Sequence, residues 1–451
     1  MFIGFDYGTA NCSVAIMQDG QSKLLNLEQG SPFIPSTLSA PSRESVTEYL
    51  YRFMDIQPFD AQGEQGLRRA INLNKQDDIE LIEGDLLFGQ AALDLYLRDP
   101  SEVYYVKSPK SFLGASGLQP IQLSFFEDLV CAMMANIKQQ AEHEIGQNIT
   151  QAMIGRPINF QGRGGEASNQ QAQSILERAA QRAGFSSVAF QYEPVAAGLD
   201  YEASLTSDKK VLVVDIGGGT TDCSMLLMGP SFVNQSTRTE QLLAHSGQRV
   251  GGNDLDIHLA YKQIMPHFGL GGSTQSGIAL PNSQFWNPIA INDVMAQKDF
   301  YASSNRKALK QLIEQAKQPE RLAHLLATYE QTAGHQIVRC AEDAKIGLSQ
   351  QPQHDLNLGL SSGLIHASLT DADLESAIEA PLIKMAELIK EILNQSQTKP
   401  DVVYMTGGSA RSPLLQAMVK SLLPEVDVVG GDYFGSVTSG LARWGQQVFN
   451  A

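Results

Sequence analysis

The sequence predicts an α/β protein made of two related lobes, and the main reason is a hairpin pattern that occurs twice. In the centre of the chain, the apolar residues 211–214 indicate a buried strand, which ends at Asp215 and continues through a glycine turn into a second apolar strand. The chain begins with a similar pattern, in which an apolar strand leads through Asp6, Gly8 and Thr9 into another strand. One copy in each half of the chain indicates two lobes that close on one ligand.

The central glycine turn has the composition of a phosphate-binding site. Gly217, Gly218 and Gly219 let a ligand approach the backbone closely, and the successive N–H groups of such a turn bind anions. Thr220 adds a hydroxyl donor. Asp215 is favourable beside a phosphate only where a divalent cation or an attacking water lies between them. The alternative interpretation is a glycine-rich hairpin with an acidic, solvated end.

Composition excludes several classes of protein. The 451 residues suggest two or three domains, and 43% hydrophobic with 18% charged residues is typical of a soluble globular protein. A net charge of −16 argues against a general nucleic-acid binder. The four cysteines are scattered and predicted to be reduced. The sequence has no apolar run of about eighteen residues and no signal-peptide pattern, so we expect no membrane span and a cytoplasmic protein.

The two hairpins resemble those of the actin, sugar-kinase and DnaK-type chaperone superfamily, which includes the heat shock protein 70 family. This resemblance implies the two-lobed actin-like ATPase fold of duplicated ribonuclease H-like domains with inserted subdomains. It also implies ATP or ADP and Mg²⁺ as cofactors. One aspartate from each lobe, Asp6 and Asp215, is then expected to hold the cation through water. In the first hairpin, the expected nucleotide-binding residues are Gly8, Thr9, Ala10 and Asn11.

Two further motifs complete the expected catalytic set. The family has a Lys-x-x-x-Gly element whose lysine reaches the cleaved phosphate, and Lys110 matches it, with Lys107 as the fallback and a solvated surface lysine as the alternative. Glu193 precedes Pro194 in a segment similar to the family's Asn-Glu-Pro-Thr-Ala-Ala, where a carboxylate can hold the waters of a cation; an ordinary acid at a helix N-terminus is the alternative. The expected catalytic residues are Asp6, Lys110, Glu193, Asp215 and Thr220.

The second half carries two motifs that resemble nucleotide contacts. Gly251 and Gly252 precede an Asp-x-Asp pattern and are expected to present N–H groups to the phosphates at a helix start. Glu342, Lys345 and Ser349 keep the family's Glu-x-x-Lys-x-x-x-Ser spacing, which places them on one helix face. The resemblance implies that they bind the ribose and an edge of the adenine. A solvated, salt-bridged helix face is the alternative.

A third motif resembles the family's adenosine loop. Gly407, Gly408, Ser409 and Arg411 form a Gly-Gly-Ser-x-Arg-x-Pro sequence between an expected strand and helix. The glycines permit backbone contact with the base, and Arg411 is suited to stack on it. The alternative is a plain turn between a strand and a helix. Further on, Phe434 stands where the family often has an aspartate, which puts one base contact in question.

Two other residues, one a match to the family and one a departure from it, concern the coupling of nucleotide state to a neighbouring domain. The sequence predicts a helix over about 125–145, a strand within the segment 152–160 that ends at Pro157, and a helix over about 167–184. Pro157 matches the proline that relays nucleotide state in the family. The arginine that the family usually has near the start of the next helix is Gln173 here, so we expect this relay to be weakened.

The remaining segments are predicted from local patterns. Residues 41–85 are polar and are interpreted as an insertion, and residues 269–305, rich in glycine and proline, as a long loop or a second insertion. Leucines around 309–313 and 322–326 mark helices. Residues 355–369 are expected to form a hairpin. After it, one helix is expected from Thr370 to Ile378 and another over about 381–393.

These motifs lead to one preferred function. Lobe I is expected over 1–205 with an inserted subdomain at about 30–150, and lobe II over 206–451 with one at about 255–350, without a substrate-binding domain. The chain resembles the short, divergent YegD-type chaperone-like proteins, which implies an ATP-hydrolysing, chaperone-related protein with an unidentified protein client or co-chaperone. A small-molecule kinase of the same fold and an ATP-switched scaffold or filament protein are the alternatives. No nucleic-acid or membrane partner is expected.

Overall fold

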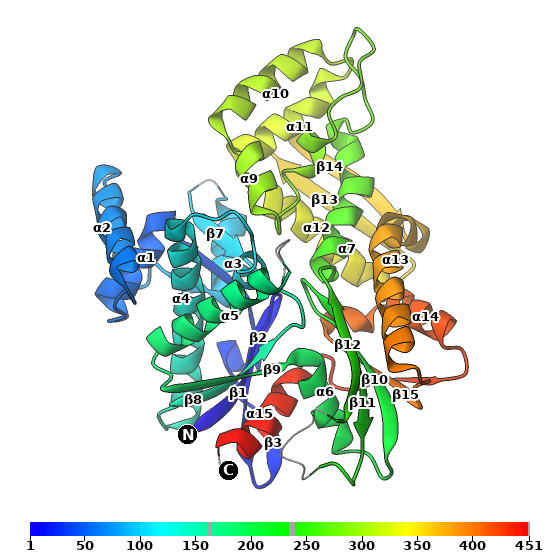
Figure 1. The fold of residues 1–451 in the computed structure, drawn as a ribbon. Coiled ribbons are helices and arrows are strands. Elements are labelled where there is room, and N and C mark those ends of the chain that lie inside the picture. The colour runs from blue at the N-terminus through cyan, green and yellow to red at the C-terminus, as the bar shows by residue number, and fades with distance from the viewer. Residues whose placement is uncertain (101, 161–164, 234–239, 450–451) are drawn as a thin grey trace. The chain divides into compact units, whose positions relative to one another are not determined.

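The computed structural model describes residues 1–100, 102–160, 165–233 and 240–449, and it confirms the predicted α/β class. The chain folds into two compact units. We call the first the core unit; it consists of Met1–Tyr96, Val103–Gly251 and Lys384–Ala451. We call the second the inserted unit; it consists of Leu97–Glu102 and Gly252–Ile383. Figure 1 labels the elements of both.

The first sheet of the core unit is built on the N-terminal hairpin. Its strand order is β3-β2-β1-β8-β9, with β4 paired to β2. The strand β1 is antiparallel to β2 and parallel to β8, and β8 is parallel to β9. The strands are β1 (Phe2–Tyr7), β2 (Asn11–Gln18), β3 (Gln21–Leu24), β4 (Phe33–Pro35), β8 (Gln151–Arg156) and β9 (Ser187–Tyr192).

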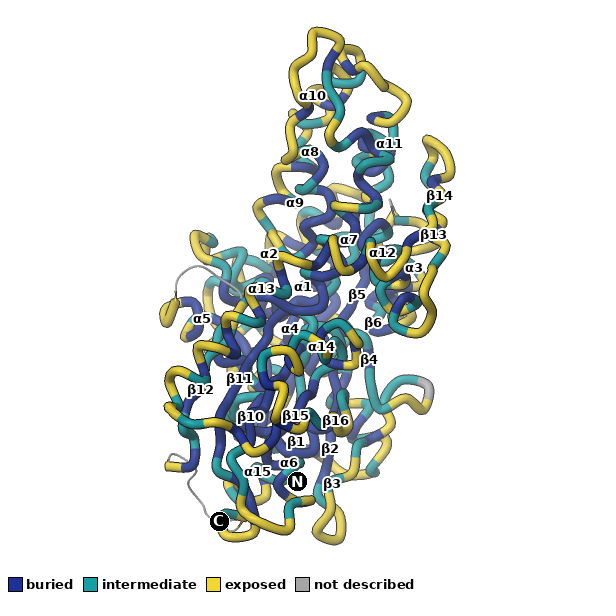
Figure 2. The backbone as a smooth tube through the Cα atoms, turned by 90° about the vertical axis from the view of Figure 1, so that its right-hand side faces the viewer, coloured by how far each residue is buried: buried dark blue, intermediate teal, exposed yellow. Residues whose placement is uncertain are grey.

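The second sheet repeats this arrangement. Its order is β12-β11-β10-β15-β16, in which β10 is antiparallel to β11 and parallel to β15, and β15 is parallel to β16. Both sheets therefore share one topology, as the repeated hairpin predicted. In Figure 2 the strands β10 and β11 are almost entirely buried. The strands are β10 (Lys209–Ile216), β11 (Thr221–Met228), β12 (Leu242–Gln248), β15 (Val402–Thr406) and β16 (Asp427–Gly430).

Two helices, α6 (Glu193–Glu202) and α15 (Ser436–Phe449), join the two sheets. The helix α15 packs on α6 and on β1, and α6 packs on β10 and β11 (Figure 1). The hydroxyls of Ser13 and Thr438 form a buried hydrogen bond between β2 and α15. The apolar core here contains Met153, Val195, Ala196, Ala197, Leu199, Val211, Val213, Leu226, Met228, Val402, Tyr404, Val437 and Leu441.

Helices and a small sheet complete the core unit. The helices predicted over about 125–145 and 167–184 are present as α4 and α5. The helix α4 begins earlier than predicted, because Pro120 occupies its first turn and Gln119 and Gln122 form a capping box. The small sheet has the order β6-β5-β7. These elements are β5 (Thr37–Ala40), β6 (Leu87–Phe88), α3 (Gly89–Arg98), β7 (Tyr104–Lys107), η2 (Pro109–Phe112), α4 (Pro120–Ile145), α5 (Glu166–Arg182), η5 (Gly408–Arg411) and α14 (Pro413–Leu422), with η1 (Glu28–Gly30).

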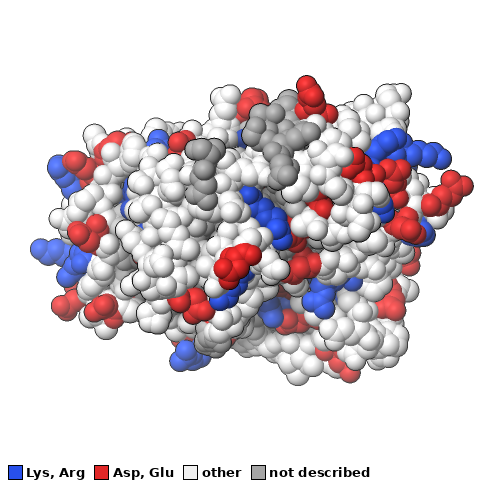
Figure 3. Space-filling model, turned by 90° about the horizontal axis from the view of Figure 1, so that it is seen from below, with Lys and Arg blue, Asp and Glu red and all other residues white. Residues whose placement is uncertain are grey.

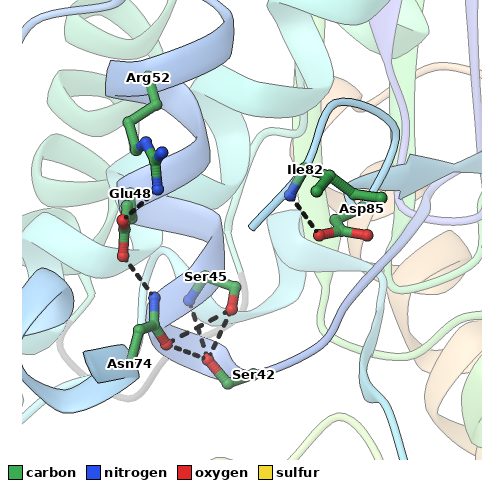
Figure 4. Close-up of polar contacts among 7 residues, drawn as sticks. All are labelled: Ser42, Ser45, Glu48, Arg52, Asn74, Ile82 and Asp85. Carbon is green, nitrogen blue, oxygen red and sulfur yellow. Dashed lines mark hydrogen bonds and ion pairs between the residues drawn. The ribbon is translucent and has the colours of Figure 1, made fainter. Parts of the chain in front are cut away.

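The segment 41–85 forms a pair of helices, α1 (Arg43–Phe53) and α2 (Ala61–Gln76). A buried polar network joins them (Figure 4). Asn74 on α2 accepts a hydrogen bond from Ser42, the N-cap of α1, at 2.7 Å and donates one to Glu48 at 2.8 Å. Because each buried polar group has a partner, the two helices are held in one register.

The inserted unit contains helices and one hairpin, β13 (Gln353–Leu360) with β14 (Gly363–Thr370), as predicted. The expectation of a long loop over 269–305 was wrong, because short helices occur there and bury Phe285 and Phe300. The helices are α7 (Gly252–Leu259), η3 (Ala260–Ile264), η4 (Met265–Phe268), α8 (Ser283–Trp286), α9 (Val294–Phe300), α10 (Ser303–Gln315), α11 (Pro319–Glu330) and α12 (Gly334–Leu348).

One long helix, α13 (Asp371–Ser396), replaces the two predicted helices, so that prediction was wrong. Pro381 lies inside it, and a proline within a helix costs about 3 kcal/mol because a backbone N–H is lost and the ring clashes with the preceding turn. Apolar side chains are buried on both sides of the proline, among them Ile378 and Met385. Their burial offsets the cost and keeps the helix continuous.

Three general expectations can be compared with the structure. All four cysteines are free thiols, and three of them are buried. Among the described residues, no helix is long and apolar enough to span a bilayer. On the face drawn in Figure 3, basic and acidic side chains are interspersed and form no continuous basic patch.

Candidate active site

The two predicted hairpins meet in the core unit. A Cβ atom on Gly218 would lie 2.9 Å from the Cβ of Ala10, so the central turn and the N-terminal turn are in direct contact. A Cβ on Gly251 would lie 2.8 Å from the carbonyl oxygens of Gly217 and Gly218. Such close backbone contacts accommodate only glycine. The predicted phosphate-binding turns therefore form one continuous surface.

Lys110 and Glu193 form a buried ion pair beside these turns. The Lys110 Nζ lies 2.5 Å from the Glu193 Oε1, and the side chains are only 4% and 13% exposed. Lys110 lies on the short helix η2, which follows Ser108 in a left-handed conformation (φ 58°). Burial opposes the charged lysine, but the negative charges of Glu193 and Asp6 outweigh burial and raise the pKa of Lys110. The fallback candidate, Lys107, is the last residue of β7.

Three aspartates lie near this pair, and all have raised pKa values. Burial, and then the charge of Glu193, raise the pKa of Asp6 to about 7. The same two causes raise the pKa of Asp222 to about 7. Burial raises the pKa of Asp215 well above its usual value, and Glu193, Asp222 and Asp6 add to the effect. The positive charge of Lys110 acts against these shifts at all three carboxylates, so the three share it as a nearby cation.

Asp222 is a residue that the sequence analysis missed. It is directly opposite Asp215 across the β10–β11 hairpin and is 1% exposed. Its Oδ1 accepts a hydrogen bond from the backbone N–H of Ile158 at 2.8 Å, which ties the second sheet to the segment after β8. The available signal was its position at the end of the glycine turn, where antiparallel pairing places it beside Asp215.

The donor set fits Mg²⁺ held through water. Mg²⁺ prefers oxygen ligands and keeps several of its waters. Asp6 and Asp215 offer carboxylate oxygens, and the negative charge of the nearby Glu193 adds to burial in raising the pKa of both. In the part of the chain that the structure describes, no group of three or more His, Cys, Asp or Glu side chains is placed to hold a metal ion.

The loop that follows β15 lies against the central hairpin. Gly407 has a φ of 85°, and a Cβ on it would lie 2.6 Å from the Asp215 Oδ1. The Ser409 hydroxyl donates to the Gly217 carbonyl at 3.4 Å. Arg411, at the end of η5, is exposed. The structure therefore brings the predicted adenosine loop next to the predicted phosphate turn.

The motif Glu342, Lys345 and Ser349 belongs to the inserted unit. Glu342 and Lys345 lie on α12, and Ser349 caps the end of that helix. The Lys345 Nζ lies 2.6 Å from the Asp256 Oδ1 and 3.5 Å from the carbonyl oxygen of Gly252. Ser349 donates its hydroxyl to the Lys345 carbonyl at 3.0 Å. The predicted contacts of these residues with adenosine stay predictions.

Residues 158–160, which follow Pro157 and which we call the relay segment, connect the two sheets of the core unit. Asn159 donates to the Gly247 carbonyl at 3.1 Å, and Arg249 donates to the Phe160 carbonyl at 2.8 Å. Gln173, at the position where the family has an arginine, accepts a hydrogen bond from Arg156. Gln173 is therefore engaged within the core unit.

The chain is similar to known Hsp70 proteins. A family model described as "Hsp70 protein" matches residues 121–272, a stretch that contains Glu193, Asp215 and Asp222. The chaperone protein DnaK of Anaplasma marginale (strain St. Maries) is 25% identical over 466 residues, which cover 98% of this chain. The chain spans 58% of the length of that relative.

Proposed function

We propose, because the chain belongs to the Hsp70 family of actin-like ATPases, that its core unit binds ATP with Mg²⁺ and hydrolyses it to ADP and phosphate. The observation that carries this proposal is the buried Lys110–Glu193 pair, which lies beside Asp6 and Asp215 where the two glycine turns meet. The alternative interpretation, a solvated surface lysine, requires an exposed side chain, whereas Lys110 is 4% exposed.

The roles follow from the chemistry of each group. The turns at Gly8–Asn11 and Gly217–Thr220 bind phosphate oxygens through backbone N–H groups and the Thr220 hydroxyl. Lys110 neutralises charge on the transferring phosphoryl group. Glu193 and Asp215 orient the attacking water, whose oxygen bonds to the γ-phosphorus as the bond to the β–γ bridging oxygen breaks. Asp215 takes up the proton that this water releases. When Mg²⁺ is bound, it neutralises the negative charges of the phosphates.

The first test separates binding from turnover. Mg-ATP at a hundred times its dissociation constant should stabilise the folded protein by about 2.7 kcal/mol, because only the folded state binds it. We therefore expect a higher melting temperature with Mg-ATP. An unchanged melting temperature at millimolar Mg-ATP would contradict the proposal.

The second test is Lys110→Ala with Lys107→Ala as its matched control. Because Lys110 is assigned to the transition state, its loss should lower kcat on the order of a hundredfold and leave KM nearly unchanged. Lys107→Ala should keep both constants. Phosphate release is the measurement, and equal turnover of Lys110→Ala and the wild-type chain would remove Lys110 from the mechanism.

We further propose a chaperone-related role in which the nucleotide switch acts with a protein partner. Support comes from the similarity to a DnaK chaperone. Four free cysteines are typical of a reducing compartment, so we propose the cytoplasm.

A further inference from the structure

The helix pair α1 and α2, which the proposed function does not use, encloses a cavity together with the N-terminal part of α4 (Figure 1). Its volume is about 240 Å³, and all three helices belong to the core unit. Each helix contributes positions three or four apart, which lie on one face, such as Gly66 with Ala70 on α2 and Phe125 with Asp128 on α4. The cavity is smaller than the pockets that hold drug-sized ligands, which start at roughly 300 Å³.

Interactions within the protein hold the walls of this cavity. The polar network of Figure 4 joins α1 to α2. The Thr47 hydroxyl donates to the Asp128 Oδ2 at 2.7 Å and so joins α1 to α4. Asp128 also forms an ion pair with Arg182 at 2.8 Å, so its charge is satisfied inside the protein. The cavity is therefore formed before any ligand binds.

Three other charged side chains line the cavity, and they are available to a ligand. Among the described residues, Arg43, Glu44 and Arg69 have no ion-pair partner. The Arg43 guanidinium carbon lies 4.3 Å from the centre of the Phe125 ring, and this cation–π contact leaves its N–H groups for an anion. Both arginines are exposed, and Glu44 is half-buried. The cavity thus offers two positive charges and one negative charge.

Gly66 indicates that the cavity is more than a gap between solvated helices. It lies inside the 16-residue helix α2, where glycine is less favourable than alanine. A Cβ on Gly66 would meet only the Ser124 hydroxyl, at 4.0 Å, so no packing contact requires a glycine here. Gly66 also lines the cavity. A glycine that packing does not require keeps this space open, as a binding site needs.

We propose that this cavity binds a small amino acid with two carboxylates, of the glutamate or aspartate class. The two guanidinium groups of Arg43 and Arg69 match the two carboxylates, since a guanidinium binds a carboxylate through two hydrogen bonds. The Glu44 carboxylate matches the ammonium group. A simple dianion would leave Glu44 without a counter-charge, and a monocarboxylate would leave one guanidinium without one. None of these residues takes part in the proposed ATP hydrolysis, so either proposal can fail without the other.

The first experiment compares ligands on the full wild-type chain. Calorimetry measures dissociation constants for L-glutamate, L-aspartate, glutarate, L-glutamine and inorganic phosphate. We expect saturable binding of glutamate or aspartate. Glutarate lacks the ammonium group and glutamine lacks the second carboxylate, so each should bind more weakly on the order of 10- to 100-fold, as expected for the loss of one hydrogen-bonded charge.

Two results of this comparison would overturn the proposal. The first is that neither acidic amino acid binds at millimolar concentration. The second is that glutarate, glutamine or phosphate binds as tightly as the better acidic amino acid, because recognition would then not use all three charges.

The second experiment removes one charge at a time. Arg69→Ala should weaken binding of the acidic amino acid on the order of 10- to 100-fold. Arg68→Ala is the matched control and should change nothing, because Arg68 is 80% exposed, pairs with Glu64 and does not line the cavity. Glu44→Gln should weaken glutamate but not glutarate, which has no ammonium group. Wild-type affinity in Arg69→Ala, or an equal loss of both ligands in Glu44→Gln, would contradict the assignment.

The third experiment fills the cavity. Leucine is a better helix former than glycine, and a Cβ at this position enters open space, so Gly66→Leu should fold with at least the wild-type melting temperature. It should abolish binding of the acidic amino acid. Gly66→Ala adds only one methyl group and should weaken binding while it stabilises the fold. Wild-type affinity in both variants would place the ligand elsewhere and refute the proposal.

Discussion

Asp222 shows how strongly one residue depends on its surroundings. Its carboxylate is buried, faces Asp215 across the hairpin and accepts the Ile158 N–H. Burial and Glu193 raise its pKa to about 7, from 3.8. Because the folded state then binds the proton more tightly than the unfolded state, the free energy of unfolding decreases as pH rises from about 4 to about 7.

We therefore expect Asp222→Asn to stabilise the nucleotide-free protein at pH 8 and to have little effect at pH 4. Asparagine keeps the acceptor for the Ile158 N–H and removes the charge, so the melting temperature at pH 8 should rise by a few degrees, roughly the shift that 1 kcal/mol produces in a large domain. The exposed Asp77 provides a matched control in Asp77→Asn, which should show no such pH-dependent gain. A lower melting temperature of Asp222→Asn at pH 8 would contradict this assignment.

At the scale of elements, the contact between α6 and α15 determines how the two sheets share one core. The two helices approach so closely that a Cβ on Gly440 would lie 1.7 Å from the Ala196 carbonyl oxygen. The neighbouring turn of α15 contains Gly445, whose Cβ would meet only side-chain atoms, at 3.1 to 3.3 Å. Both glycines thus lie in α15, but a side chain at Gly440 would meet the backbone of α6, whereas one at Gly445 would meet side chains.

Gly440→Ala should destabilise the protein, because the backbone of α6 would have to move, and overpacking of this kind typically costs about 1–3 kcal/mol. Gly445→Ala should cost less than Gly440→Ala, since its nearest contacts are side-chain atoms and alanine gains about 1 kcal/mol over glycine within a helix. Urea unfolding of both variants measures the difference. Equal stability of Gly440→Ala and the wild-type chain would show that the helices are not packed as described.

At the scale of the whole chain, the core unit unites two sheets of identical strand order, and the relay segment is tied to both. Asp222, Gly247 and Arg249 of the second half all bond to residues 158–160, which follow β8 of the first sheet. A conformational change at the phosphate turn would therefore act on this segment through these hydrogen bonds.

We expect the chain alone to give no nucleotide-dependent suppression of aggregation of a denatured enzyme. The reason is that Gln173 replaces the relay arginine and is occupied by Arg156. Light scattering with ATP and with ADP is the measurement, and Lys110→Ala serves as a control for hydrolysis. Suppression that ATP switches in the wild-type chain but not in Lys110→Ala would refute this expectation.

Features that depend on neighbouring residues could be predicted from the sequence. The two hairpins, the helix start at Glu193 and the strand–turn–helix around Gly407 follow from apolar periodicity, glycine and proline, which act within a few residues. Asp6, Glu193, Asp215 and Thr220 of the catalytic proposal lie in these motifs, whereas Lys110 was found through the resemblance to a family. The pairing of Lys110 with Glu193, which are 83 residues apart, could be expected only through resemblance to a family.

Only the tertiary structure decided the rest, because it depends on contacts between distant segments. Pro381 indicated a break in a helix, but burial on both sides kept α13 continuous. The sequence of residues 41–85 did not reveal that Asn74 would join α2 to the cap of α1. Asp222 became a site residue through antiparallel pairing, and Phe434 packs against Phe33 and Arg411, which belong to other elements. In each case burial or pairing between segments, rather than local propensity, determined the outcome.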